Sequence, residues 1–212
     1  MTDKIGWKAA LAGSAALLAL AGSAGTAEAQ DNWCVSGQAA YQARDYAAAR
    51  EAFTACLEGG DIAAAQLPDA HHRRGRSHMK LGDHAAALAD FDRAVARDET
   101  HAQVLNSRAW TLLLMELPED ALPDAEAAKA LAPDDARIAD SYAHVLSALG
   151  RETAARQAFD AALELQTREQ IVKFQEHLRA AGYDPGPSDG VAGPGTRAAI
   201  AACVRERCII WK

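Results

Sequence analysis

The sequence predicts an all-α protein in which a solenoid of helical hairpins is followed by a small helical domain. Three observations support this fold class. One apolar helix pattern recurs at a fixed spacing along most of the chain. The composition is rich in alanine with only 6% aromatic residues, which suits an array that buries its surface between neighbouring repeats. A dense cluster of Gly and Pro then separates two short amphipathic helices near the C-terminus.

The recurring pattern places an aromatic or small residue at i+4 between alanine or cysteine at i and i+7, on one helical face. Phe53, Phe91, Ala125 and Phe159 occupy this central place, at separations of 38, 34 and 34 residues. An upstream helix precedes each of them. The spacing therefore predicts four hairpins, with helices near 33–43, 46–57, 68–81, 84–97, 101–115, 118–131, 135–149 and 152–165.

A period of about 34 residues with two helices per repeat is the tetratricopeptide spacing. Over residues 30–166 the chain therefore resembles the tetratricopeptide repeat (TPR) family. Gly75 stands at the family's small eighth position and Pro133 at its closing proline, whereas Ala125 replaces the usual aromatic of the third repeat. The resemblance implies that Phe53, Phe91 and Phe159 are buried between the hairpins.

The resemblance also implies a concave groove lined by defined positions of each upstream helix. The candidate groove residues are His72, Arg76, Met79, Lys80, Asn106, Trp110 and His144. A basic rim with an aromatic floor suits an acidic or C-terminal peptide of a partner protein. Two alternatives remain open: the basic cluster is a solvated face, or Trp110 packs on the next repeat. No metal site is expected, because His71 and His78 are seven residues apart without an HExxH motif.

The N-terminus has the features of a signal peptide. Lys4 and Lys8 precede an apolar run over 9–21, and Ala27-Glu28-Ala29 is a small-x-small cleavage site. We expect residues 1–29 to be removed and the mature protein to be periplasmic, without a stable membrane span. The apolar run is shorter than the roughly 20 residues that a span needs; an uncleaved anchor is the alternative.

Charge and cysteine content limit the function further. The net charge of −7 argues against nucleic acid as the main partner. Four cysteines in an exported chain indicate disulfides, and three pairings are possible. The TPR register brings Cys34 and Cys56 to the same level of one hairpin and favours their pairing, with a buried free thiol at Cys56 as the alternative. A Cys203–Cys208 bond is possible only if the helix ends between them.

A second resemblance covers residues 167–212. The residues that carry it are Gln175, Leu178, Gly182-Tyr183, Pro185-Gly186, Asp189-Gly190, Gly193, Thr196 and Ala199-Ile200. In order and spacing they resemble the small three-helix peptidoglycan-binding domain. The resemblance implies binding of peptidoglycan, for which Tyr183, Asp189, Gly190 and Thr196 are the candidate residues. Cys203-Val204 replaces the family's Phe-Gln, which puts wall binding in question.

No pair of positioned carboxylates or nucleophile constellation accompanies these motifs, so we expect no enzyme and no cofactor. The favoured hypothesis is a periplasmic adapter, whose repeats bind a protein or peptide while the C-terminal module binds peptidoglycan. The alternative is a pure protein-interaction protein whose C-terminal module no longer binds the wall.

Overall fold

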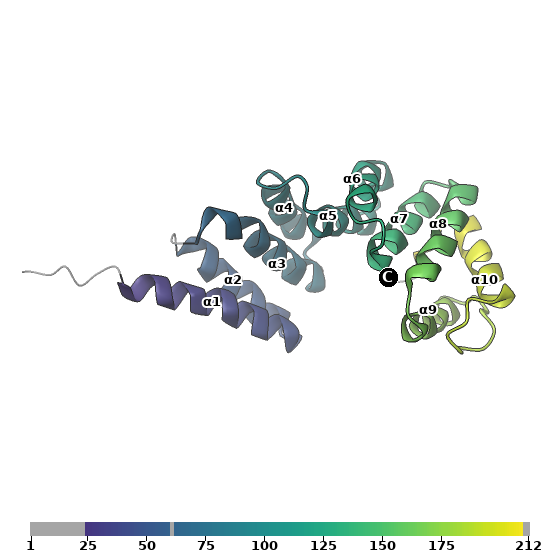
Figure 1. Cartoon of the computed structure of the whole chain (residues 1–212), viewed down its shortest axis with the longest axis horizontal. Coiled ribbons are helices and arrows are strands. Elements are labelled where there is room, and N and C mark those ends of the chain that lie inside the picture. Colours follow the sequence, from purple (N-terminus) through teal and green to yellow (C-terminus); the bar gives the residue numbers. More distant parts are fainter. Residues whose placement is uncertain (1–23, 60–61, 210–212) are drawn as a thin grey trace, which may run out of the picture.

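The computed structural model describes residues 24–59 and 62–209, and all regular structure in these residues is helical. Figure 1 labels ten α-helices and the chain order is simple. The helices are α1 (Ala24–Gln42), α2 (Tyr46–Glu58), α3 (Leu67–Lys80), α4 (His84–Val95), α5 (Ala102–Leu114), α6 (Pro118–Leu131), α7 (Ala136–Ala148), α8 (Glu152–Leu165), α9 (Arg168–Ala180) and α10 (Pro194–Arg205), with a short 3-10 turn at Ala64–Gln66. The predicted fold class is confirmed.

Four antiparallel hairpins, α1–α2, α3–α4, α5–α6 and α7–α8, stack one after another (Figure 1). Side-chain caps mark several helix starts. Asp45 accepts a hydrogen bond from the amide of Ala48 at 3.0 Å, and Asp83 accepts one from Ala86 at 3.1 Å. Because these carboxylates satisfy first-turn amides, the chain leaves each turn in a defined direction.

Close approach within a hairpin depends on small residues facing an aromatic ring. A Cβ added at Gly75 would lie 2.7 Å from Cε1 of Phe91, so any larger residue would displace the ring. The exposed fractions of Phe53, Phe91 and Phe159 are 1%, 0% and 1%. The expectation that these three rings are buried is therefore confirmed.

A buried ion pair also repeats with the period of the array. Arg74 on α3 binds Asp90 on α4 through two hydrogen bonds of 2.7 and 2.8 Å. Arg108 on α5 binds Asp124 on α6 in the same way at 2.6 and 2.7 Å. The two arginines are 34 residues apart, as are the two aspartates. Each pair ties the two helices of its hairpin together.

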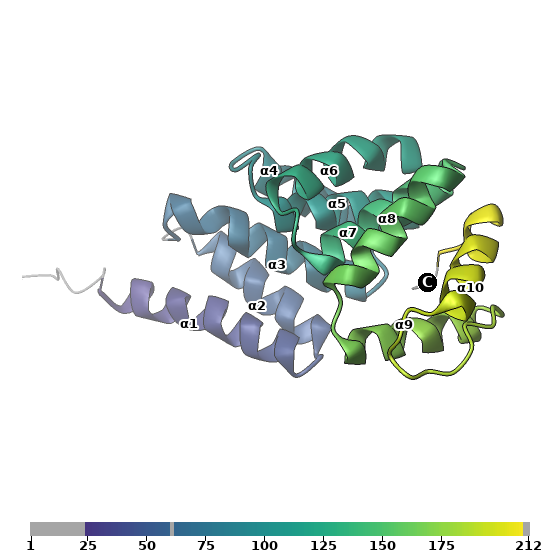
Figure 2. The same ribbon diagram turned by 45° about the vertical axis from the view of Figure 1, so that its right-hand side comes forward.

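The last hairpin and the C-terminal module share one core, with no linker between them. Leu146 on α7 and Phe159 and Leu163 on α8 belong to the same buried cluster as Phe174 on α9 and Ile200 on α10. The ring centroids of Phe159 and Phe174 are 6.1 Å apart. Figure 2 shows α9 and α10 held against this end of the array. Helix α8 therefore serves both the repeats and the module.

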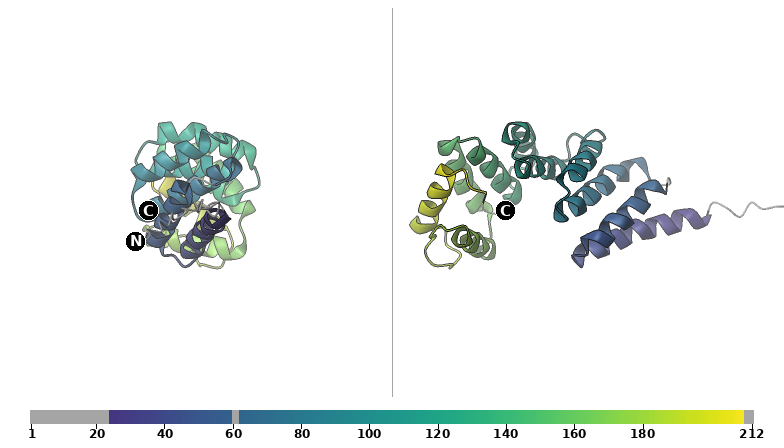
Figure 3. Two further views of the ribbon diagram at one scale, coloured as in Figure 1. Left: turned by 90° about the vertical axis from the view of Figure 1, so that its left-hand side faces the viewer. Right: turned by 180° about the vertical axis from the view of Figure 1, so that it is seen from behind.

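The segment after α10 turns back toward the repeats. Cys208 packs against the shared core, and Ile209 packs against the cluster formed by α5, α6 and α7. Figure 3 shows from behind that this end of the chain returns to the array. The segment thereby covers part of α7.

The structure contains two disulfides, Cys34–Cys56 and Cys203–Cys208. Their Cα atoms are 5.3 and 5.1 Å apart. Helix α10 ends at Arg205, between the second pair, as that bond requires. No cysteine among the described residues is free.

The predicted signal peptide lies mostly outside the described residues, which begin at Ala24. Helix α1 starts there and runs across the predicted cleavage site at residues 27–29. None of the helices in the described part of the chain is long and apolar enough to cross a membrane.

Candidate ligand-binding sites

One buried glutamine organises the loop between α9 and α10. Gln175 is 1% exposed, and its Nε2 donates toward the carbonyl of Val191 at 3.0 Å and Oγ1 of Thr196 at 3.1 Å. Its Oε1 accepts from the amide of Gly190 at 3.0 Å. A buried amide group with these partners fixes an otherwise irregular loop, because each bond replaces one to water. Gln175 therefore positions the loop from inside.

The base of α9 holds the same loop from outside. Arg168 Nε donates to the carbonyl of Asp189 at 2.8 Å. Gly190 has a φ of +75°, and a Cβ there would lie 2.3 Å from Cγ of Arg168. Glycine is therefore required at this position by both the backbone conformation and the close approach.

These contacts correct part of the predicted wall-binding set. Thr196 and Gly190 are buried and hold the loop, so neither side of the loop presents them to a ligand. Asp189 is exposed, but its Oδ1 accepts from the amide of Val191 at 2.9 Å. That bond, helped by Gln175, holds the pKa of Asp189 below its ordinary value. Asp189 thus acts as a turn residue, whereas Val191 is 56% exposed on the same loop.

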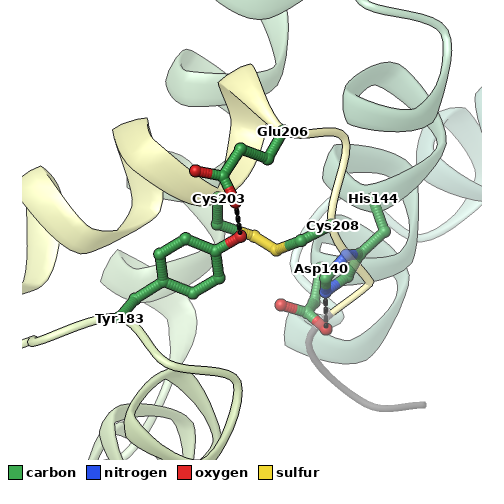
Figure 4. The surroundings of a disulfide bond; sticks show 6 residues. All are labelled: Asp140, His144, Tyr183, Cys203, Glu206 and Cys208. Atoms are coloured by element: carbon green, nitrogen blue, oxygen red, sulfur yellow. Dashed lines mark hydrogen bonds and ion pairs between the residues drawn. A yellow bond between two sulfur atoms is a disulfide. The ribbon is translucent and has the colours of Figure 1, made fainter.

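Tyr183 lies at the start of the loop and is partly exposed. Its hydroxyl donates to Oε2 of Glu206 at 2.7 Å, which connects the loop to the end of α10 (Figure 4). The hydrogen bond to Glu206, together with burial and the negative charge, raises the pKa of Tyr183 to about 12. The ring edge remains available beside the Cys203–Cys208 disulfide.

The predicted groove residues separate into exposed and buried groups. Lys80 is exposed, and Arg76, Met79, Asn106 and Trp110 are partly exposed. The Arg76 guanidinium lies 4.8 Å from the ring centroid of Tyr41, so Arg76 is held by α1. Part of the predicted basic and aromatic face is therefore accessible.

The two histidines of that set are buried, which corrects their assignment to the ligand-contacting surface. His72 is 8% exposed and its Nε2 lies 2.9 Å from Oγ of Ser107. His144 is fully buried, with its Nε2 3.8 Å from Asp140 (Figure 4). Burial lowers the pKa of both to about 3, and for His144 contact with the Cys208 backbone acts weakly in the opposite direction.

The physical reason for the misassignment of His144 is the returning C-terminal segment. His144 occupies the same repeat position as Arg76 and Trp110. Cys208 and Ile209 pack onto this end of the array, and His144 is enclosed between Trp110 at 5.5 Å and Phe159 at 4.9 Å between ring centroids. A repeat position alone does not reveal this cover.

A cavity of about 380 Å³, here called the junction cavity, lies where the repeats meet α9. Its wall is formed by Lys80, Trp110, Ala136, Arg137, Asp140, Ser141, Gln166, Gln170 and Lys173. The repeats supply the residues up to Ser141, and the start of the module supplies the rest. Sequence reasoning missed Arg137, Gln166 and Lys173, because their proximity depends on how the module packs.

Within the described residues, no group of three or more His, Cys, Asp or Glu side chains is arranged to hold a metal ion. The polar groups of both sites are instead neutral amides, hydroxyls and separated charges. Such groups suit recognition of a ligand by hydrogen bonds and charge.

Comparison with protein families supports both halves of this arrangement. Residues 68–101 match a family model described as tetratricopeptide repeat. Residues 146–203 match a model described as peptidoglycan binding domain. The second match begins near the end of α7, so it includes α8 as its first full helix. That range agrees with the shared core.

Solved structures show the same repeat fold. MamA from Desulfovibrio magneticus RS-1 is 20% identical with a TM-score of 0.61, covering 85% of this chain and 94% of MamA. PilF from Pseudomonas aeruginosa is 21% identical with a TM-score of 0.57, covering 74% of each chain. The first TPR domain of Spaghetti, bound to an HSP90 peptide, is 18% identical with a TM-score of 0.53, covering 57% of this chain and 94% of that domain. No curated protein sequence matches the chain significantly.

Fold and site together define the class of protein. The chain is a tetratricopeptide repeat protein with a C-terminal segment of the peptidoglycan binding type. Both are recognition modules in which binding surfaces are built on a helical scaffold.

Proposed function

We propose that this protein is a non-enzymatic periplasmic adapter, whose C-terminal module binds peptidoglycan and whose repeats hold a protein or peptide partner. The observation that carries the proposal is the family match over 146–203, which coincides with an ordered loop held by Gln175. Disulfides in both modules and the signal-like N-terminus support the periplasmic location.

The wall-binding surface we propose is the exposed side of the loop over 184–192, together with the ring of Tyr183. Val191 is a large apolar side chain left 56% exposed there, and exposed apolar groups are typical of contact surfaces. The buried side of the same loop is occupied by Gln175 and Thr196, which leaves only the outer side for a ligand.

Co-sedimentation of the mature chain, residues 30–212, with purified sacculi tests this proposal. We expect the protein to pellet with the sacculi and Val191→Glu to remove most of the pelleted fraction. Val35→Glu is a matched control, because Val35 is 65% exposed at the other end of the molecule. The full mature chain is needed, because a cut at residue 167 would divide the core shared by Phe159 and Phe174.

The alternative, a protein-interaction protein without wall binding, is favoured by Cys203-Val204 in place of the family's Phe-Gln. It predicts no pelleting of the wild type above the level without sacculi. Export is tested separately, since alkaline phosphatase fused after residue 40 is active only if the N-terminus directs export. An inactive fusion would contradict the periplasmic location.

A further inference from the structure

The junction cavity carries more positive than negative charge, although the whole protein has a net charge of −7. Lys80, Arg137 and Lys173 reach its wall from α3, α7 and α9. Asp140 is the only carboxylate of this wall, and its side chain is 13% exposed and lies toward His144. Three cationic groups from three helices therefore face the opening against one recessed carboxylate.

These cations are available to an anionic ligand. Lys80 makes no ion pair with any of the described residues. Arg137 pairs with Asp135 at 3.3 Å, and Lys173 pairs with Glu169 at 2.8 Å. Both pairs are solvent exposed, and such pairs contribute about 0–1 kcal/mol, so a ligand carboxylate can replace the partner at little cost.

The rest of the wall requires more than an anion. Trp110 offers a partly exposed ring, which is suited to an apolar side chain. Gln166 Oε1 is a buried acceptor that no donor among the described residues reaches. A buried acceptor without a donor is destabilising, so this atom favours a ligand that brings an N–H group.

We propose that the junction cavity binds the carboxy-terminal end of a partner protein. The terminal carboxylate lies among Lys80, Arg137 and Lys173, an apolar side chain packs on Trp110, and a backbone N–H donates to Gln166. This inference deepens the proposed adapter function by naming the ligand class and placing it at a site that α9 completes. Most of the wall belongs to the repeats, whose accessible face continues to Arg76 and accommodates an extended chain.

Fluorescence anisotropy with defined peptides tests the proposal on the mature chain. The probe is fluorescein-labelled Leu-Glu-Glu-Leu with a free carboxylate, compared with its C-terminal amide and with Leu-Lys-Lys-Leu. We expect the free acid to bind at least about tenfold more tightly than the amide, which corresponds to 1.4 kcal/mol. Binding should weaken as salt is raised. Equal binding of acid and amide would overturn the terminal-carboxylate assignment.

Variants locate the ligand. Lys80→Glu combined with Lys173→Glu should weaken the free acid at least about tenfold, which again corresponds to 1.4 kcal/mol. Arg97→Glu with Arg156→Glu makes the same charge change at exposed positions outside the cavity and should leave binding unchanged. Trp110→Ala should weaken binding while Trp110→Phe retains it. Equal effects of the two double variants would show only a general charge effect and would overturn the site.

The wall assay separates this inference from the proposed function. The Lys80/Lys173 double variant should still pellet with sacculi, so loss of peptide binding with retained pelleting supports both proposals. Absence of pelleting with intact peptide binding would remove the wall function and leave the cavity assignment standing. A soluble muropeptide digest is the competing ligand class, since its stem peptides also carry carboxylates. If the digest binds and the acidic peptide does not, the protein-terminus assignment is wrong.

Discussion

Replacement of Phe159 by alanine tests whether the last repeat and the C-terminal module form one cooperative unit. The Phe159 ring is 1% exposed and lies 4.9 Å from the His144 ring and 6.1 Å from the Phe174 ring, between centroids. Removing a buried Phe side chain costs about 3–5 kcal/mol, and loss of its ring contacts adds about 0.5–1.5 kcal/mol. We expect a loss near the top of the first range.

The location of the loss is more informative than its size. Because α8 contributes to the cores of both parts, hydrogen exchange should accelerate together in α7, α9 and α10, while α3 and α4 keep their protection. Amide exchange measured by mass spectrometry resolves these helices. Phe159→Leu is the matched control, and its milder volume change should cost about 1 kcal/mol.

A change confined to α7 and α8, with normal protection in α9 and α10, would refute the shared core. The reverse result, with exchange altered only in the module, would refute it equally. A urea transition in which the module unfolds separately from the last hairpin would give the same answer by a different measurement.

Three other perturbations follow from the buried polar groups and the disulfides. Asp90→Asn should cost about 3–5 kcal/mol by urea unfolding, since it leaves a buried arginine without its charge partner, whereas Asp92→Asn on the exposed face should cost less than about 1 kcal/mol; equal losses would contradict the buried pair. His72 and His144 have pKa values lowered by burial to about 3 from 6.5, so the unfolded state takes up protons first and stability falls as pH drops below 6.5. The expected loss at pH 5 is on the order of 2 kcal/mol per histidine, and His144→Leu should remove about half of it; an unchanged slope would contradict the assignment. Cys34→Ser should lower stability by about 2–4 kcal/mol, with faster exchange in α1 and α2 only, and an equal effect of reductant on wild type and variant would exclude the bond.

The hairpin register accounts for most of what the sequence predicted correctly. Helix bounds agree within a few residues for α2 to α8, because the spacing between Phe53, Phe91 and Phe159 fixes where each helix lies on its neighbour. The Cys34–Cys56 pairing follows from the same register. These features depend on contacts between adjacent repeats, which recur along the chain.

The features that the sequence did not reveal depend on contacts that do not recur. The enclosure of His144 requires a segment more than 60 residues later in the chain to fold back, and no repeat position records this. The junction cavity has the same origin. The Arg74–Asp90 and Arg108–Asp124 pairs are different, since their 34-residue displacement was visible in the sequence as a second periodic signal.

Sharing α8 between two structural units also limits how this architecture is rearranged by gene fusion. A recombination joint placed at residue 167 would leave the incoming module without Phe159 and Leu163, which complete its core. A joint in the turn between α6 and α7 would instead transfer the last hairpin and the module together. The transferable unit is therefore larger than the loop-bearing segment, and grafting it onto another repeat array preserves the orientation of its binding loop relative to that array.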